Sequence, residues 1–283
     1  MNKQIIGCLN GVFDMFNINH LNVLKNAKEK CDFLIVGVLT DELLKKQKKE
    51  APIFSFEERI KIVSSIRYVD KAVPIDGDIF NQEFITSNNI NVMFIVAEWG
   101  LVKKERVELL KKKCKILFID NSNCGSSSTC INQNEHCKDG CKIGYTTGVF
   151  DMFHIGHLNV LKNAKEKCDF LIVGVSTDEN VETYKNKKPI VPFAFRKEIV
   201  EAIKYVDLVV PQNNMDKFEA WKELHFHYLF HGDDWKGSKM YNELELKLNS
   251  VGCKVIFLPH TDGISSTILR NKISDYSTEK LKN

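Results

Sequence analysis

One stretch of this chain occurs twice. Residues 11–38 read GVFDMFNINHLNVLKNAKEKCDFLIVGV, and residues 148–175 read GVFDMFHIGHLNVLKNAKEKCDFLIVGV. The copies differ at only two positions, which lie within one short segment: NINH at 17–20 and HIGH at 154–157. A repeat of this quality indicates an internal duplication, so we expect both halves of the chain to adopt the same fold.

Apolar runs alternate with segments of helical period in both halves, which predicts a parallel sheet with helices on both faces. Strands are predicted at the start of the chain and at 31–39, 71–74, 92–96, 115–119, 142–147, 169–175, 208–211, 228–232 and 254–259. Helices are predicted near 20–30, 55–67, 101–113, 157–167, 193–204, 216–224 and 240–250, with one more between 74 and 92 and a last one after residue 267. The predicted fold class is α/β, with two tandem Rossmann-like domains, each built on a parallel sheet.

The length and the charge balance narrow the classes of protein. A chain of 283 residues is long enough for about two domains. With 40 Lys and Arg against 37 Asp and Glu, the chain is too balanced to indicate a nucleic-acid partner. Its apolar runs are shorter than the roughly 20 residues that cross a bilayer, so we expect no membrane insertion. Since the opening segment resembles residues 142–148, it is expected to be a strand rather than a targeting signal, and the protein to be cytoplasmic.

A segment rich in Asn, Ser, Gly and Cys separates the halves. We therefore predict a degenerate domain at 1–130, a linker at 131–141 and a catalytic domain at 142–283. The nine cysteines are expected to be reduced and mostly buried. The linker region holds four metal-ligand side chains, but their spacing is not that of a zinc finger, so we predict no metal site: Cys130, His136, Cys137 and Cys141.

The HIGH segment lies between the first strand and the first helix of the second half. In a doubly wound sheet this turn is at the carboxyl edge, where ligands bind. Gly148 allows close approach of a ligand, and Gly156 leaves room beside the backbone. His154 and His157 flank a helix start, where N–H groups favour phosphate. Two histidines at this spacing are by themselves more often ordinary polar residues, but the complete motif in this context favours phosphate chemistry.

Further segments extend this pattern, and the chain resembles the HxGH nucleotidyltransferases, specifically the cytidylyltransferases. The second half is most similar to the glycerol-3-phosphate branch, and the tandem arrangement resembles phosphoethanolamine cytidylyltransferases. The segments that carry the resemblance are HIGH, STDE at 176–179, KNKKP at 185–189 with Arg196, KYVDLVVP at 204–211, HGDDWKG at 231–237 and HTDGISST at 260–267. His260 stands where that branch has arginine.

The resemblance implies roles for matching residues. His154 and His157 would bind the α-phosphate of CTP and stabilise the transition state, and Lys185 and Lys187 would hold phosphate oxygens; these four are the predicted catalytic residues. The predicted nucleotide-binding residues are Gly148, Val149, Phe150, Asp151, Gly156, Arg196, Gly232, Asp233, Asp234, Trp235, His260, Thr261, Gly263, Ile264, Ser265, Ser266 and Thr267. Read alone, lysine-rich loops are usually solvated, and the ISST segment is a well-capped helix start.

The implied activity is transfer of CMP from CTP to a small phosphorylated alcohol, giving a CDP-alcohol and pyrophosphate. Mg²⁺ would accompany the nucleotide phosphates rather than occupy a protein cage. Glycerol 3-phosphate is the favoured acceptor, with phosphoethanolamine or phosphocholine as alternatives. An adenylyltransferase is a more remote alternative. A rival of another class is a non-catalytic nucleotide sensor or scaffold.

The first half has lost the matching features one after another. Besides NINH, it has AEWG at 97–100 in place of GDDW, and NCGSSST at 123–129 lacks the Thr-Asp-Gly-Ile lead-in. We predict that this half folds without turnover, and we leave open whether it binds CTP. The two halves are predicted to pair as an intrachain pseudo-dimer, with a homodimer as a further option.

Overall fold

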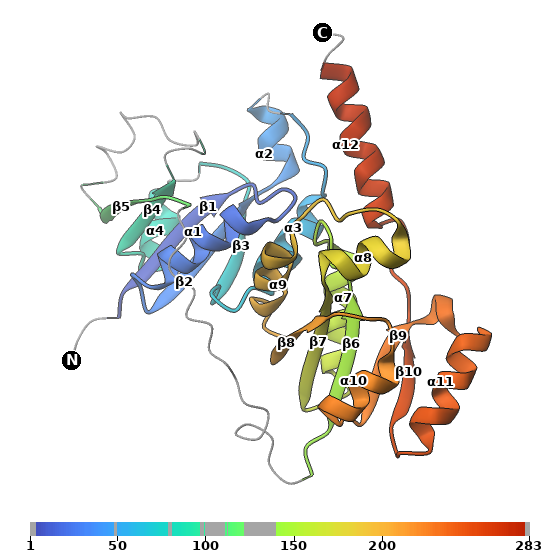
Figure 1. Cartoon of the computed structure of the whole chain (residues 1–283). Helices are drawn as coiled ribbons and strands as arrows, with labels where there is room; N and C mark the ends of the chain where they lie inside the picture. Colours follow the sequence, from blue (N-terminus) through green and yellow to red (C-terminus); the bar gives the residue numbers. More distant parts are fainter. Residues whose placement is uncertain are drawn as a thin grey trace. The chain divides into compact units, whose positions relative to one another are not determined.

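The computed structural model describes residues 4–47, 50–78, 81–96, 99, 111, 113–121 and 140–280, with side chains up to residue 273. The chain divides into two compact units, Met1–Ser127 and Ser128–Asn283, which Figure 1 colours from blue to red along the sequence. The predicted linker and the predicted boundary at residue 130 lie almost wholly outside the described residues and stay predictions.

The second unit is built on one sheet of five parallel strands in the order β10-β9-β6-β7-β8. Its strands are β6 (Ile143–Gly148), β7 (Phe170–Ser176), β8 (Leu208–Gln212), β9 (Tyr228–Gly232) and β10 (Lys254–Leu258). β6 is central, and the strand order reverses beside it, because the chain crosses from β8 at one edge to β9 on the other side of β6. In such a sheet the carboxyl ends on either side of the reversal form the ligand-binding crevice.

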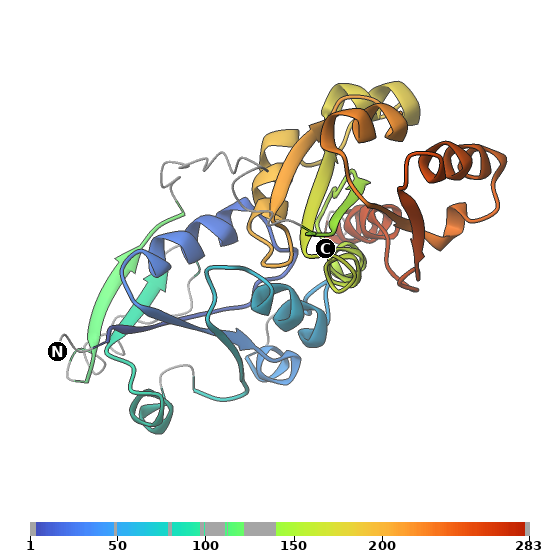
Figure 2. The same cartoon turned by 90° about the horizontal axis from the view of Figure 1, so that it is seen from below.

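Helices connect these strands and cover both faces of the sheet, as Figures 1 and 2 show. They are α7 (Ile155–Lys165), α8 (Asp178–Lys185), α9 (Phe193–Glu201), α10 (Lys217–Leu224), the short 3₁₀ helix η2 (Asp233–Trp235), α11 (Lys239–Asn249) and α12 (Ser266–Lys280). α7 packs against β6, β7, β9 and β10. Residues of α10 and α11 join a core that includes Tyr145, Phe226 and Leu229.

The first unit repeats this topology, with the strand order β3-β2-β1-β4-β5. Its strands are β1 (Ile6–Gly11), β2 (Phe33–Leu39), β3 (Lys71–Ile75), β4 (Val92–Val96) and β5 (Lys115–Ile119), and its described helices are α1 (Ile18–Lys28), α2 (Asp41–Lys46), α3 (Phe56–Ser64) and α4 (Gln82–Ser87). The predicted fold class is therefore confirmed for both halves. The predicted helix at 101–113 lies almost wholly outside the described residues.

Two helices were missed by the sequence prediction, α2 and its counterpart α8. Each begins after a threonine whose hydroxyl caps the helix: Leu43 N–H donates to Thr40 Oγ1 at 3.3 Å, and Asn180 N–H donates to Thr177 Oγ1 at 3.2 Å. Both caps are followed by acidic residues in the first turn. Threonine followed by two acidic residues is a helix-start signal, so these helices were predictable in principle.

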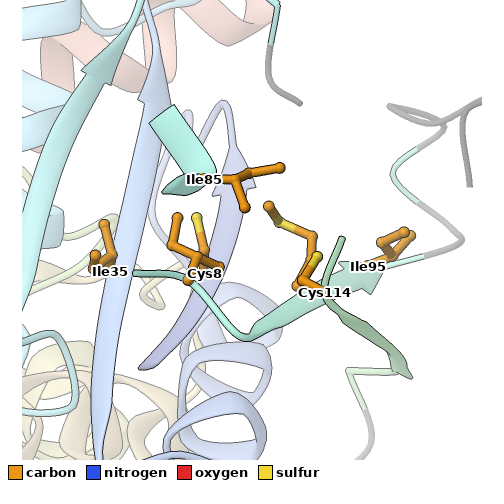
Figure 3. Close-up of a cluster of buried hydrophobic side chains, with 7 residues drawn as sticks. Cys8, Ile35, Ile85, Ile95 and Cys114 are labelled. Atoms are coloured by element: carbon orange, nitrogen blue, oxygen red, sulfur yellow. The ribbon is translucent and has the colours of Figure 1, made fainter. Parts of the chain in front are cut away.

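The core of the first unit shows where its cysteines lie. Cys8 and Cys114 pack with Met93 and several isoleucines in the cluster drawn in Figure 3. Burial raises the pKa of the Cys8 thiol strongly, and the neighbouring Cys114 adds to this. The six described cysteines are free, and all except the partly exposed Cys141 are buried. These thiols therefore serve as apolar packing groups.

Among the described residues, no helix is both long enough and apolar enough to span a membrane.

Candidate nucleotide-binding site

The turn from β6 to α7 has an uncommon backbone. Phe150 and Met152 both adopt the left-handed region, with φ of 55° and 49°, and their counterparts Phe13 and Met15 do the same, with φ of 56° and 44°. Residues other than glycine rarely occupy this region, and they do so mainly where the surroundings impose it. The shared sequence therefore builds the same tight turn in both units.

His154 is the N-cap of α7. Its Nδ1 atom accepts a hydrogen bond from the Gly156 N–H at 3.1 Å. In a neutral imidazole an accepting Nδ1 leaves the proton on Nε2, so His154 presents an N–H donor at the helix start. The prediction placed the start of this helix near residue 157, whereas α7 begins at Ile155 because the histidine itself supplies the cap.

The rings of His154 and His157 stack, with centroids 3.8 Å apart and planes at 25°. Phe150 contacts the His157 ring with its edge, at a centroid distance of 5.3 Å. His157 Nδ1 is buried and has no hydrogen-bond partner among the described residues. A Cβ atom on Gly156 would lie 3.0 Å from the His154 ring, so this glycine makes room for the histidine itself.

The environment keeps both imidazoles neutral. Burial lowers the pKa of His154 to about 4, and the charge of His260 acts in the same direction. Burial also holds the pKa of His157 well below 6.5, with further lowering by His154 and Lys185. These couplings mean that His260 and Lys185 lie near the pair. All four of these side chains belong to the predicted site, and their role there stays a prediction: His154, His157, Lys185 and His260.

Asp151 ties three segments together rather than facing outward. Its carboxylate accepts from the N–H groups of Ile190 at 3.0 Å and Val191 at 2.9 Å, and from Arg270 Nη2 at 2.7 Å. Its carbonyl oxygen accepts from Ser266 Oγ at 2.9 Å. The first turn of α12 and the segment before α9 are thereby fixed to the β6–α7 turn.

The predicted lysine loop adds positive charge beside the histidines. Lys185 ends α8, and burial, Lys187 and Arg270 together lower its pKa. Lys187 is exposed, and Lys188 lies 3.6 Å from Glu182. Lys185 therefore lies near His157, and Lys187 and Arg270 lie near Lys185.

Arg196 does not have the position that direct nucleotide contact requires. Its side chain has no exposed surface, and it pairs with Asp178 at 2.6 Å. Its guanidinium also donates hydrogen bonds to the carbonyl oxygens of Val149, Ser176 and Val191. Arg59 makes the equivalent contacts in the first unit, so this arginine braces the loops in both copies.

The GDDW and HTDG segments meet at the carboxyl edge of the sheet. Gly232 ends β9, and Asp233 accepts from the His260 N–H at 3.2 Å. The Asp234 carboxylate folds back over Gly232, where a Cβ atom would lie 2.6 Å from Oδ1. Trp235 packs against His231 and Tyr241 and keeps 39% of its surface exposed.

The predicted phosphate-binding segment leads into α12. Thr261 Oγ1 accepts from Asn159 of α7 at 2.9 Å, Gly263 has a φ of 79°, and Ile264 is buried. Ser265 Oγ accepts from the Ile268 N–H at 3.2 Å, and Ser266 and Thr267 form the first turn of α12. The segment is thus a helix start attached to the HIGH turn.

Sequence reasoning missed Lys217 and His231. Lys217 starts α10 and is 4% exposed. Neither Lys217 Nζ nor the buried His231 Nδ1 has a hydrogen-bond partner among the described residues. Burial lowers the pKa of Lys217 to about 8, and burial together with the Lys217 charge lowers that of His231 to about 4. A buried unpaired ammonium is costly and marks a site for an anion.

The first unit uses the same positions differently. Asn17 Oδ1 accepts from the N–H groups of Asn19 and His20, and the Asn17 N–H donates to His20 Nδ1 at 3.3 Å. Trp99 packs edge-on against Phe13 and His20, and a Cβ atom on Gly11 would lie 2.6 Å from the Trp99 ring. The polar groups of this turn are therefore satisfied within the protein, and an indole covers it. The other residues of AEWG, and all of 123–129, lie outside the described residues.

The second unit has a parallel sheet whose strand order reverses, with stacked histidines and lysines at the carboxyl edge of that sheet. This arrangement is typical of a nucleotide-binding transferase. The sequence model of the cytidylyltransferase-like family matches residues 8–134 and again residues 145–272. The chain belongs to this family and is a nucleotidyltransferase with two tandem domains, as the resemblance predicted.

Three relatives illustrate the breadth of the similarity. A glycerol-3-phosphate cytidylyltransferase of Bacillus subtilis is 36% identical over 46% of this chain and 95% of its own length. An ethanolamine-phosphate cytidylyltransferase of Dictyostelium discoideum is 28% identical over 82% of this chain and 80% of its own length. An FAD synthase of Thermococcus sibiricus is 37% identical over 41% of this chain and 78% of its own length. The family accordingly leaves the acceptor open.

Proposed function

We propose that the second unit transfers CMP from CTP to a phosphorylated alcohol, most favourably glycerol 3-phosphate. The observation that carries this proposal is the stacked pair His154 and His157 at the start of α7, beside Lys185 and the first turn of α12. The site offers N–H donors and positive charge in a largely buried setting, which suits a triphosphate.

The paired imidazoles would act on the α-phosphate. An acceptor phosphate oxygen attacks the α-phosphorus, and the bond from that phosphorus to the α,β-bridging oxygen breaks with its electron pair leaving on pyrophosphate. His154 and His157 donate hydrogen bonds to oxygens that gain charge in the transition state. No covalent enzyme intermediate is needed, so catalysis consists of positioning and charge stabilisation.

The phosphates beyond the α-phosphate would lie between two elements. The hydroxyls and N–H groups of Ser265, Ser266 and Thr267 suit the β- and γ-phosphates, and Lys185 with Lys187 adds charge from the opposite loop. His260 would assist as a hydrogen-bond donor. Asp234 and Trp235 are proposed to contact the cytidine, and Arg196 to act only by bracing the loops.

Mg²⁺ is proposed to arrive with CTP. Among the described residues there is no cluster of three His, Cys, Asp or Glu side chains suited to a metal ion. The buried carboxylate of Asp151 is already bonded to two N–H groups and Arg270. A metal carried by the phosphates fits these residues, and it would supply shielding of phosphate charge.

Lys217 and His231 are proposed to receive the acceptor phosphate. A bound dianion would give the buried Lys217 ammonium a hydrogen-bond partner, which it lacks among the described residues. The HGDDW segment supports glycerol 3-phosphate, as does the name of the Bacillus subtilis relative. Phosphoethanolamine is the second candidate, because the Dictyostelium discoideum relative aligns across both repeats.

The first unit is proposed to be non-catalytic. The Asn17 side chain already accepts from the N–H groups at the start of α1, which a triphosphate would need. The Trp99 ring fills the space beside His20 and Gly11. Pairing of the two units as a pseudo-dimer and a cytoplasmic location stay predictions from the sequence. Expressing residues 142–283 alone tests the pairing, because equal activity from a monomeric fragment would remove the need for the first unit.

The decisive experiment is a substrate panel. Radiolabelled CTP and ATP are each incubated with glycerol 3-phosphate, phosphoethanolamine and phosphocholine, and both the products and pyrophosphate are measured. We expect CDP-glycerol from CTP. Formation of CDP-ethanolamine would reassign the acceptor, and binding of CTP without pyrophosphate release would favour the sensor.

A further inference from the structure

Arg270 connects the start of α12 to the HIGH turn. Its Nη2 atom lies 2.7 Å from Asp151 Oδ2 and donates to the Lys188 carbonyl oxygen at 3.4 Å. The Asp151 side chain is 4% exposed and that of Arg270 is 26% exposed. The ion pair is therefore mostly shielded from solvent, so its strength depends closely on its geometry.

The ion pair completes a junction of three segments. Asp151 also accepts from the N–H groups of Ile190 and Val191, so the segment that follows the lysine loop meets the HIGH turn at the same carboxylate. Ser266 Oγ donates to the carbonyl oxygen of Asp151 from the first turn of α12. Arg270 thus adds a second attachment of α12, one turn further along the helix.

The guanidinium of Arg270 also adds positive charge to the site. Arg270 lowers the pKa of Lys185, which in turn acts on His157. Lys187 also lowers the pKa of Lys185, so three cations lie near one another on this side of the junction: Lys185, Lys187 and Arg270. Because the Asp151 carboxylate offsets only part of this charge, the junction keeps a net positive potential.

The first half offers a natural comparison. Asp14 keeps the two backbone bonds, from Ile53 N–H at 2.8 Å and Phe54 N–H at 3.0 Å. The ISST segment of the second half ends at Thr267, and Arg270 follows three residues later. The matching SSST segment of the first half ends at Thr129, and Asn132 stands three residues later. The aspartate bracket is thus kept in both halves, while the arginine is present only in the half that keeps HIGH.

We propose that Arg270 is a positioning residue for cytidylyl transfer. It holds the phosphate-binding turn Ser265–Thr267 against His154 and His157 through Asp151, and it adds charge beside Lys185. This inference rests on the proposed function, because the turn is taken to bind the β- and γ-phosphates of CTP. The role differs from a folding role, since Asp14 holds the equivalent loop in the first unit without a counterpart of Arg270 in the sequence.

The test compares Arg270→Ala, Arg270→Gln and Arg270→Lys with the control Lys272→Ala, an exposed cation on the same helix. CTP binding is measured by calorimetry, turnover by CDP-glycerol formation, and folding by thermal melting. We expect Arg270→Ala to weaken CTP binding by about tenfold or more, because misplacing a binding group by about 1 Å is costly. The KM for the acceptor should change little. Arg270→Lys and added guanidinium ion should restore part of the affinity, and Lys272→Ala should match the parent chain.

Unchanged CTP affinity and kcat in folded Arg270→Ala would overturn the inference. An equal loss of affinity for CTP and for acceptor that guanidinium does not rescue would also overturn it, because it indicates general disorder. If Arg270→Ala does not fold, Arg270→Gln and Arg270→Lys decide through the same CTP titration. If the parent chain forms no CDP-alcohol, the proposed function fails. The CTP titration still shows whether Arg270 supports nucleotide binding, so the two failures can be distinguished.

Discussion

The imidazoles of His154 and His157 stack with their centroids 3.8 Å apart, and Nδ1 of His154 accepts from the backbone of its own helix. This contact fixes which nitrogen of His154 is free to donate. Two neutral rings can lie this close, whereas two protonated rings would repel each other. The pair is therefore arranged for donation of hydrogen bonds at neutral pH, before any phosphate is bound.

The first prediction concerns pH. Burial lowers the pKa of His154 from 6.5 to about 4, so in this window the unfolded chain binds more protons than the folded one. Stability therefore rises with pH through the window and falls on acidification, by about 2 kcal/mol near pH 5 for this group. CTP should raise this pKa and protect the protein more at pH 5.5 than at pH 7.5. Thermal melting with and without CTP measures both effects, and His154→Asn is the control that should lose the CTP-dependent part.

The second prediction concerns catalysis. His157→Ala should lower kcat by about 10²–10⁴-fold, because a donor to the developing charge is lost. His20→Ala is the matched control at the same position of the first copy, and it should leave kcat unchanged. Initial rates of CDP-alcohol formation, with circular dichroism as the folding check, measure this. Full activity in folded His157→Ala would reject the assignment of the HIGH turn.

The third prediction separates stability from function at Lys217. Lys217→Met removes a buried unpaired ammonium, so the free energy of unfolding should stay the same or increase by about 1 kcal/mol. At the same time the KM for the phosphorylated acceptor should rise about tenfold or more, while the affinity for CTP should stay near that of the parent. Chemical denaturation and two-substrate kinetics measure the two effects. A destabilised variant with an unchanged acceptor KM would show that Lys217 is structural.

The fourth prediction uses the imidazole at position 260. A guanidinium stays charged at neutral pH, so His260→Arg should lower the KM for CTP about three- to tenfold at pH 7.5. The gain should shrink at high ionic strength, because salt screens the added charge. CTP titrations at low and at high salt test this, and an equal gain at both would contradict a charge-based role.

The fifth prediction concerns the first unit. In a His157→Ala background, Asn17→His with Asn19→Gly should not create activity, because Trp99 still packs against His20 and Gly11. CDP-alcohol formation by the triple variant measures this. Activity clearly above that of the His157→Ala single variant would show that the two asparagines alone keep the first unit inactive.

The sheet and most of its elements were predictable because apolar runs such as β7 record burial directly in the sequence. The same holds for the HIGH turn, since its residues are contiguous. α2 and α8 were missed because short, charged helices depend on caps, here Thr40 and Thr177, rather than on an apolar period.

The remaining parts of the site depend on contacts between distant segments. Lys217 and His231 are brought together only by the crossover from β8 to β9, and no local pattern marks either as buried. Arg196 was assigned to the nucleotide from its place after the lysine loop, whereas the structure surrounds it with carbonyl oxygens. A positive charge in a loop signals a ligand only when its burial and its partners are known.

The left-handed turn at Phe150 and Met152 recurs at Phe13 and Met15, in a unit that has lost its histidine pair. Its backbone geometry is thus a property of the scaffold and independent of the chemistry that it supports. A duplicated gene could lose one active centre through changes of a few side chains while every intermediate protein stayed folded. With the first unit non-catalytic, as proposed, its surface is free to acquire other properties while the second unit keeps the HIGH turn.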